Sequence, residues 1–362
     1  MKETSICICG GGNLAHTVGG YLASLGNYDV RLLTRHPELW SPDGCITVSD
    51  CRGKVFRSGF SVITSDPQTA LNGAGMVILC LPGFAIAPVL ESIKLYVGHD
   101  TAIGSVVSST GFFLMAQSIL PTGTALFGFQ RVPFIARTDE YGKSARILGY
   151  KPSLAVATLN IDSPSFVPLL SGMFGVPVHR LDNFLMATLT NSNPLLHPSR
   201  LYGLFRNSGS PLPYKPLFYE DWDDFSSETL IAADEEFGAL LSVLDISRDD
   251  IPSILTYYES GDAPSLTRKL RTIPAFKGLY APVLQMSDGS YRPDFNNRYF
   301  SEDFPFGLLI IKCFAYDYGI STPTIDNILE WEQRSTGKEY FTNGRPCGKD
   351  IGQTIAPYIL KL

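Results

Sequence analysis

The first 35 residues constrain the fold more than any other part of this chain. Ser5–Cys9 is short, apolar and partly β-branched, which predicts a buried strand. The segment 10–15, GGGNLA, follows and leads into a helix of small residues, and a second strand then ends at Thr34–Arg35. This order of strand, glycine-rich turn, helix and strand fits the G-x-G-x-x-G/A fingerprint of a dinucleotide-binding domain.

Each position of the fingerprint has a physical task. Gly10 can make the tight turn, Gly12 lets the backbone approach a pyrophosphate, and Ala15 keeps the helix close to the sheet. The free N–H groups at the helix start, around Asn13 and Leu14, would bind the pyrophosphate, whose charge the helix dipole also favours. The alternative is an ordinary strand-to-helix turn, but the complete strand–helix–strand context favours a cofactor site.

The end of the second strand bears on which dinucleotide binds. An NAD site usually places an acidic residue here, against the ribose 2′-hydroxyl. Thr34–Arg35 offers a hydroxyl and a guanidinium instead, and arginine presents a planar fork of donors that matches a 2′-phosphate. A solvated surface arginine is the alternative. We therefore expect NADP(H) in preference to NAD(H), which the sequence still allows.

Length and charge set broad limits. At 362 residues the chain exceeds what one core usually serves, so we expect two domains. The formal net charge of -6 argues against a nucleic-acid-binding face, which needs clustered Lys and Arg. Apolar runs stay shorter than a membrane span, and Met1–Glu3 runs directly into the first strand, which leaves no room for a signal peptide. We expect no membrane partner.

The cysteines indicate the compartment. There are seven, scattered along the chain, and they lack the paired spacing of a metal site. They are typical of reduced, mostly buried thiols in a cytoplasmic protein, and no metal site is expected.

The first half of the chain alternates predicted strands and helices. Met76–Leu81 is continuously apolar, as in a parallel strand covered on both faces, and it is followed by Pro82 at the carboxyl edge, where ligands bind in such sheets. Residues 44–59 suggest a β-hairpin or an irregular β segment. These patterns predict an α/β fold, a doubly wound Rossmann-type domain over residues 1–182.

The second half, residues 183–362, has few β-branched runs and predicts a mostly helical domain. Ser226–Leu244 and Pro305–Tyr318 are expected helices, and Ser208–Trp222, rich in Pro, Tyr and Trp, is an expected structured loop. We expect this domain to supply the substrate site and to close over the nicotinamide end of the cofactor.

Two segments of the second half could carry chemistry. His197 lies in a segment that begins at Asn193 and opens the helical domain, near the expected domain junction. Arg298 precedes Asp303 by five positions. Ser301 could simply cap a helix whose first turn contains the acids; alternatively Asp303 binds an imidazole and Arg298 a substrate carboxylate.

Taken together, the three segments resemble the opine dehydrogenase family, which includes octopine and nopaline dehydrogenases. The resemblance covers nearly the whole chain: the GGGNLAH start, the segment from Asn193 to His197, and Arg298 followed by Asp303. It implies that His197 is the catalytic histidine, Asp303 its carboxylate partner, and Arg298 the contact for the keto-acid carboxylate, with Asn193 in the substrate site.

The resemblance also implies the reaction. A 2-oxo acid and the amine of an amino acid condense to an imine, which a nicotinamide cofactor reduces. The missing acid at Thr34–Arg35 means that the cofactor cannot be copied from NADH-using members. The sequence does not name either substrate, and it leaves the subunit count open, a homodimer included.

Two other functions remain open from the sequence. A ketopantoate-reductase-like or hydroxyacid dehydrogenase shares this layout, but such enzymes generally use a catalytic lysine, and the segment from Asn193 to His197 contains none. A noncatalytic NADP(H)-sensing protein would bind the cofactor as a ligand only. Turnover that requires both substrates indicates an opine dehydrogenase, and turnover with the oxo acid alone indicates a hydroxyacid dehydrogenase. Cofactor binding without turnover indicates a sensor.

Overall fold

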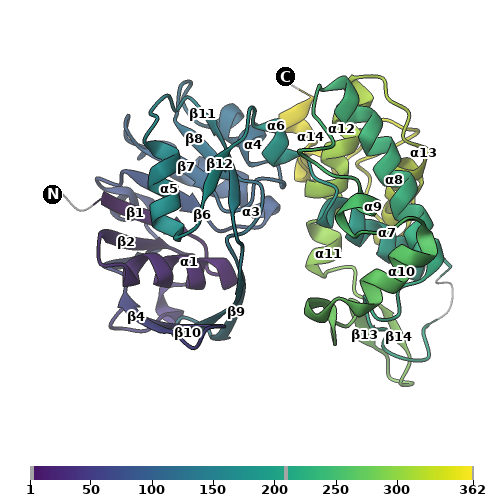
Figure 1. The fold of residues 1–362 in the computed structure, drawn as a ribbon, viewed down its shortest axis with the longest axis horizontal. Coiled ribbons are helices and arrows are strands. Elements are labelled where there is room, and N and C mark those ends of the chain that lie inside the picture. Colours follow the sequence, from purple (N-terminus) through teal and green to yellow (C-terminus); the bar gives the residue numbers. More distant parts are fainter. Residues whose placement is uncertain (1–3, 208–210, 361–362) are drawn as a thin grey trace. The chain divides into compact units, whose positions relative to one another are not determined.

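The computed structural model describes residues 4–207 and 211–360 (Figure 1). The chain divides into two compact units, residues 1–188 and 189–362, whereas the sequence suggested a division after residue 182. The short helix that follows residue 182 belongs to the first unit. The chain start and the first three residues of the predicted 208–222 loop lie outside the described residues.

The first unit is built on a large, mostly parallel sheet, eight strands in the described residues, with strand order β12-β11-β8-β7-β6-β1-β2-β5. All neighbours are parallel except β11 and β8. The strands are β1 (Thr4–Cys9), β2 (Tyr28–Leu33), β5 (Val62–Thr64), β6 (Met76–Leu79), β7 (Ala102–Ser105), β8 (Leu126–Phe129), β11 (Leu154–Leu159) and β12 (Val178–Arg180). The predicted Rossmann-type fold is confirmed.

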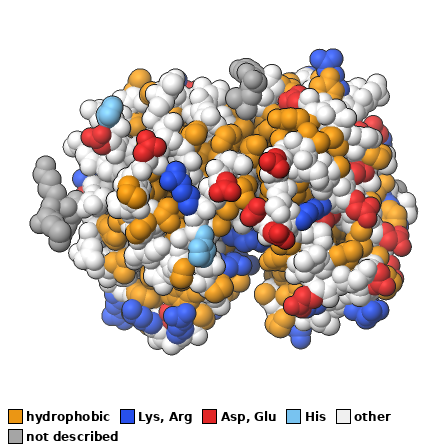
Figure 2. All heavy atoms as spheres, turned by 45° about the horizontal axis from the view of Figure 1, so that its top comes forward, with side chains coloured by type: hydrophobic (Ala, Val, Ile, Leu, Met, Phe, Trp, Pro, Cys, Tyr) orange, Lys and Arg blue, Asp and Glu red, His pale blue; other side chains and the backbone are white. Residues whose placement is uncertain are grey.

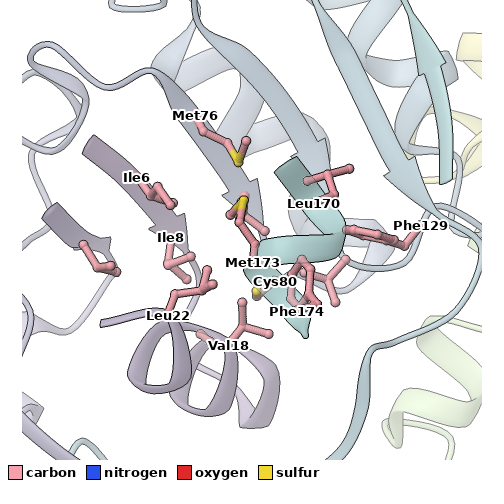
Figure 3. Close-up of a cluster of buried hydrophobic side chains, with 14 of the residues drawn as sticks. Ile6, Ile8, Val18, Leu22, Met76, Cys80, Phe129, Leu170, Met173 and Phe174 are labelled. Atoms are coloured by element: carbon pink, nitrogen blue, oxygen red, sulfur yellow. The ribbon is translucent and has the colours of Figure 1, made fainter. Parts of the chain in front are cut away.

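Helices cover this sheet because its strands are apolar on both faces. The residues of β6 are all buried, and the side chains of β1 and β6 pack with those of α1 and α5 in one core (Figure 3). The helices of this unit are α1 (Asn13–Ser24), η1 (Pro37–Leu39), α2 (Pro67–Leu71), α3 (Gly83–Ile93), α4 (Phe112–Ile119), α5 (Phe166–Phe174) and α6 (Leu185–Thr188).

A second sheet of this unit was only half predicted. The expected hairpin is present as β3 (Cys45–Asp50) and β4 (Val55–Gly59). A second hairpin, β9 (Phe134–Glu140) and β10 (Ser144–Tyr150), was not predicted. Its strand β10 pairs with β3 to give the order β4-β3-β10-β9. Strands β3 and β10 are far apart in sequence, so their pairing leaves no local signal, whereas β9 and β10 are consecutive strands.

Helix α1 contacts strands of both sheets, and two of its glycines allow neighbouring segments to approach it closely. A Cβ at Gly19 would come within 2.6 Å of the Phe60 ring, and one at Gly20 within 2.7 Å of Val48. A side chain at Gly20 would push the helix away from β3, and one at Gly19 would push it away from the segment between β4 and β5. The tight fit fixes the position of the helix start, where the glycine-rich turn lies.

The second unit is mostly helical, as predicted, with one small hairpin. Its elements are α7 (Asn193–Phe205), α8 (Asp224–Val243), α9 (Ile254–Tyr257), α10 (Ala263–Thr272), η2 (Pro274–Phe276), β13 (Val283–Gln285), β14 (Tyr291–Pro293), α11 (Arg298–Ser301), η3 (Phe304–Leu308), α12 (Leu309–Asp317), α13 (Pro323–Thr336), η4 (Ile351–Gln353) and α14 (Ala356–Ile359). The predicted helix over 305–318 is a π-helical turn, η3, continued by α12.

The surface shows no single dominant charge on the face drawn in Figure 2, where charged side chains of both signs are distributed among hydrophobic and uncharged ones. Within the described residues, none of the helices combines the length and apolar character that crossing a bilayer requires.

Candidate functional site

The glycine-rich turn joins β1 to α1 at the carboxyl edge of the large sheet. Gly10 has φ +139°, and a Cβ there would lie 2.6 Å from the carbonyl oxygen of Cys80, so only glycine fits. A Cβ at Gly12 would meet no described protein atom within 4 Å. Helix α1 begins after Gly12 without a side-chain cap, which leaves its first N–H groups for an anion.

The other predicted cofactor residues meet at the same edge. Cys9, the last residue of β1, is in register with Leu33 of β2 and Leu79 of β6, so the chain segments that leave all three strands are neighbours. A Cβ at Gly10 would lie 3.4 Å from Leu81, and Pro82 is the exposed N-cap of α3. The turn and the segments after β2 and β6 can therefore hold a dinucleotide.

Thr34 and Arg35 follow β2 at this edge. Thr34 is buried, and its hydroxyl oxygen lies beside Gly11, 3.1 Å from a Cβ built there. Arg35 is exposed, and among the described residues no hydrogen bond or ion pair engages its guanidinium. The first carboxylate after β2 is that of Glu38, which lies 3.0 Å from Nδ1 of His36.

Asn13 and His16 tie the start of α1 to the small sheet. The side-chain oxygen of Asn13 accepts the N–H of Thr138 at 2.9 Å, so for a pyrophosphate it offers its backbone N–H rather than that oxygen. His16 Nδ1 donates to the Gly12 carbonyl at 2.9 Å, and its Nε2 accepts the Gly142 N–H at 2.8 Å. Burial lowers the pKa of His16, which keeps it neutral for both bonds.

In the helical unit, the structure brings His197 and Asp303 together. Nδ1 of His197, on α7, lies 2.8 Å from Oδ2 of Asp303, which precedes η3, and both residues are buried. Ser301 ends α11, and the Asp303 side chain caps no helix, so the alternative of a simple helix cap is wrong. Because a carboxylate only accepts, the imidazole holds its proton on Nδ1 and presents Nε2 for chemistry.

The residue that contacts the other side of this imidazole was not predicted from the sequence. The Tyr219 hydroxyl lies 3.0 Å from Nε2 of His197, at the far end of a line that begins at Asp303. Tyr219 belongs to the loop that had been recognised only by its Pro, Tyr and Trp content. No motif spacing links it to His197, so only its aromatic surroundings could have drawn attention.

Arg200 was also missed, and it holds the Tyr219 loop in place. It lies one turn after His197 on α7, is 1% exposed, and donates to the carbonyl oxygens of Phe218 at 2.8 Å and Asp221 at 2.7 Å. Burial lowers the pKa of Arg200 to about 10, and nearby Asp223 and Asp221 partly oppose this shift. The guanidinium stays charged and fastens the loop to α7.

Arg298 and Asn193 occupy exposed positions near the buried pair. Arg298 begins α11, and its neighbour Tyr299 places its ring 4.4 Å from the His197 ring. Asn193 begins α7, one turn before His197. Their roles in substrate binding stay predictions.

A buried lysine of the same unit bears on the alternative of a dehydrogenase with a catalytic lysine. Lys312 is buried, but its Nζ lies 2.7 Å from Asp326 Oδ1 and 2.8 Å from the Thr322 hydroxyl, which is a structural role. Over the described residues, no group of three or more His, Cys, Asp or Glu is arranged to hold a metal ion.

Comparison with known proteins identifies the family. A model described as "NAD/NADP octopine/nopaline dehydrogenase, alpha-helical domain" matches residues 180–336, and one for ketopantoate reductase matches residues 6–128. Octopine dehydrogenase of Pecten maximus is 32% identical and covers 97% of this chain and 95% of its own length.

Solved structures agree over the same span. Octopine dehydrogenase with NADH and L-arginine is 30% identical, has a TM-score of 0.86, and covers 98% of this chain and 94% of that protein; the structure with NADH and pyruvate gives the same values. The chain therefore belongs to the octopine and opine dehydrogenase family, nicotinamide-dependent oxidoreductases that act on CH–NH bonds.

Proposed function

We propose that His197 and Asp303 serve the reductive condensation of a 2-oxo acid with the amine of an amino acid in this chain. The observation that carries the proposal is the buried hydrogen bond between Nδ1 of His197 and Asp303 in the helical unit. It leaves Nε2 as the nitrogen that exchanges protons, and a carboxylate stabilises the imidazolium when it forms.

The proton chemistry follows from this arrangement. After the amine adds to the oxo carbon, the oxygen must leave as water, and it needs a proton to do so. Protonated His197 supplies that proton, and Asp303 stabilises the charged ring until it is released. The reducing equivalent, a hydride, comes from the nicotinamide cofactor when it is bound.

Arg298 binds the carboxylate of the 2-oxo acid in this proposal. Its guanidinium is exposed, lies next to the Tyr299 ring that packs on His197, and is suited to a two-point contact with a carboxylate. Asn193 adds a polar contact at the start of α7. Pyruvate and L-arginine, seen with octopine dehydrogenase, are the first substrates to try.

The cofactor fits the residues present in the first unit. The backbone at Gly10 and Gly12 and the uncapped start of α1 would hold the pyrophosphate, since the space above Gly12 is open to a ligand. The segment after β2, where the ribose would lie, carries Thr34 and Arg35, whose guanidinium has no partner among the described residues, and this favours NADP(H) over NAD(H).

The experiment follows cofactor oxidation with 2-oxo acids and amino acids supplied separately and together. Oxidation that requires both, with a secondary-amine product detected by mass spectrometry, supports the proposal. Oxidation with the oxo acid alone would indicate a hydroxyacid dehydrogenase. Cofactor binding without oxidation by any pair would indicate a sensor.

We also place the protein in the cytoplasm. All seven cysteines lie in the described part of the chain and are free thiols, three of them exposed or partly exposed at positions 45, 51 and 347. Free thiols of this kind are typical of a reducing compartment.

A further inference from the structure

Both ring nitrogens of His197 are already engaged. Nδ1 hydrogen-bonds to Oδ2 of Asp303 at 2.8 Å, and Nε2 hydrogen-bonds to the hydroxyl of Tyr219 at 3.0 Å. His197 is 4% exposed, and its ring packs against those of Phe218 and Tyr299, at centroid distances of 5.5 and 4.4 Å. A substrate oxygen that approached Nε2 would therefore meet Tyr219 first.

The Tyr219 ring is held firmly. It stacks on Phe276 with centroids 3.9 Å apart and an interplanar angle of 13°, and it lies nearly parallel to Trp222. It is 4% exposed. To leave Nε2, the ring would have to give up this stack and open a gap in a packed region.

The backbone around Tyr219 is held as firmly as the ring. The carbonyl of Phe218 accepts from buried Arg200, and the N–H of Phe218 donates to the Leu279 carbonyl at 2.7 Å. The N–H of Leu217 donates to the Asp221 carboxylate at 2.8 Å, and Arg200 binds the Asp221 carbonyl. These hydrogen bonds hold the loop, and with it the Tyr219 hydroxyl, in one position.

We propose that Tyr219 is the group that hands the proton of His197 to the substrate, so that the proton path is Asp303–His197–Tyr219–substrate oxygen. This inference rests on the proposed function. It makes Tyr219 a catalytic residue that touches the reacting oxygen, while His197 acts through it.

The step balances without a further reactant. The Tyr219 O–H gives its proton to the hydroxyl of the amine adduct as the C–O bond breaks and water leaves, and the nitrogen lone pair forms the C=N bond. At the same time Nε2–H of His197 gives its proton to the Tyr219 oxygen. Tyr219 ends as it began, and His197 passes from imidazolium to neutral imidazole.

The surroundings require the two protons to move together. Burial raises the pKa of Tyr219 well above its usual value, Tyr299, Tyr258 and Asp303 raise it further, and Arg298 opposes them. A free tyrosinate would be costly here, so the hydroxyl must receive a proton as it releases one.

The test uses Tyr219→Phe, which keeps the stacked ring and removes only the hydroxyl, with Tyr318→Phe as the matched control at an exposed tyrosine. We expect kcat for product formation to fall by roughly 100- to 1,000-fold, within the range for one general acid. KM for the oxo acid should stay close to that of the unmodified protein, because Tyr219 is not its carboxylate contact. The control should retain full activity.

A second measurement needs no variant. In mixtures of H₂O and D₂O, the kcat of the unmodified protein plotted against the fraction of D₂O should fall along a curve, because two protons are transferred in one step. A straight line, or wild-type kcat in Tyr219→Phe, would overturn the relay while leaving the proposed function in place. A higher kcat in the variant would show that substrate displaces Tyr219. If the unmodified protein forms no product from any pair, the proposed function fails, and the relay fails with it.

Discussion

Nδ1 of His197 lies 2.8 Å from Oδ2 of Asp303, although 106 positions separate the two residues in the chain. Either residue alone has an ordinary structural explanation: a histidine inside a helix, an aspartate before a helical turn. Their direct contact in a buried site gives the imidazole one defined tautomer, with Nε2 directed to the Tyr219 hydroxyl. That geometry is what the proposed chemistry requires.

This pair should behave as a unit in kinetics. We expect His197→Gln to lower kcat by roughly two to four orders of magnitude, the usual contribution of a general acid or base. Asp303→Asn should also lower kcat, but the double variant should lose much less than the product of the two single effects. Steady-state rates of the four proteins measure this. Fully multiplicative losses would mean that the two residues act independently.

The residue after β2 should control the choice of cofactor. We expect NADPH to bind more tightly than NADH, and Arg35→Asp to reverse or erase the preference, because a 2′-phosphate would lose a charge-assisted contact. The expected change is roughly 10- to 100-fold in relative affinity. Fluorescence titration with both cofactors measures it, and Arg57→Asp, at another exposed arginine of the same unit, is the control. Equal or tighter NADH binding by the unmodified protein would show this assignment to be wrong.

Substitutions at two glycines of the same turn should have different effects, one on cofactor binding and the other on stability. Gly12→Val should abolish cofactor binding and leave the thermal unfolding midpoint nearly unchanged, because its side chain meets open space in the protein but would fill the pyrophosphate approach. Gly10→Ala should lower the midpoint itself, since its Cβ would press on the Cys80 carbonyl at a φ that favours glycine. Calorimetry and cofactor titration of both variants separate the effects. Normal cofactor affinity in Gly12→Val would remove the fingerprint argument.

A buried acid in α13 should make stability depend on pH. Burial raises the pKa of Glu332 to about 7, although the Tyr340 hydroxyl donates to it. The folded chain therefore holds this proton more tightly than the unfolded chain, whose value is about 4.5. Protonated Glu332 therefore makes its full contribution to the free energy of unfolding below pH 4.5. That contribution, on the order of 3 kcal/mol, is lost as the pH rises to about 7.

Glu332→Gln should remove that loss, because an amide stays neutral and keeps an oxygen to accept from Tyr340. Urea unfolding at pH 5 and pH 8 measures the effect as the difference between variant and unmodified protein. Glu228→Gln, at an exposed glutamate of α8, should leave the pH dependence unchanged. An unaltered pH dependence in Glu332→Gln would show that Glu332 titrates normally.

The sequence was informative where structure is encoded locally. The β1–α1–β2 unit follows from an apolar run, a glycine turn and small residues, because backbone conformation and burial depend on neighbours in the chain. The β9–β10 hairpin is also a local pairing and was missed, but its attachment to β3, about a hundred residues earlier, has no local signal in the sequence. Strand pairing of that kind depends on how the whole unit packs.

The site divides in the same way. By itself the sequence determined the fold of the N-terminal half and the turn at Gly10 and Gly12, and through resemblance it predicted the roles of His197 and Asp303. Only the tertiary structure decided that Tyr219 covers the second nitrogen of the imidazole and that Arg200 holds its loop. Local patterns specify helices, strands and turns, but a contact between side chains from separate elements exists only after the elements have packed, and no spacing along the chain records it.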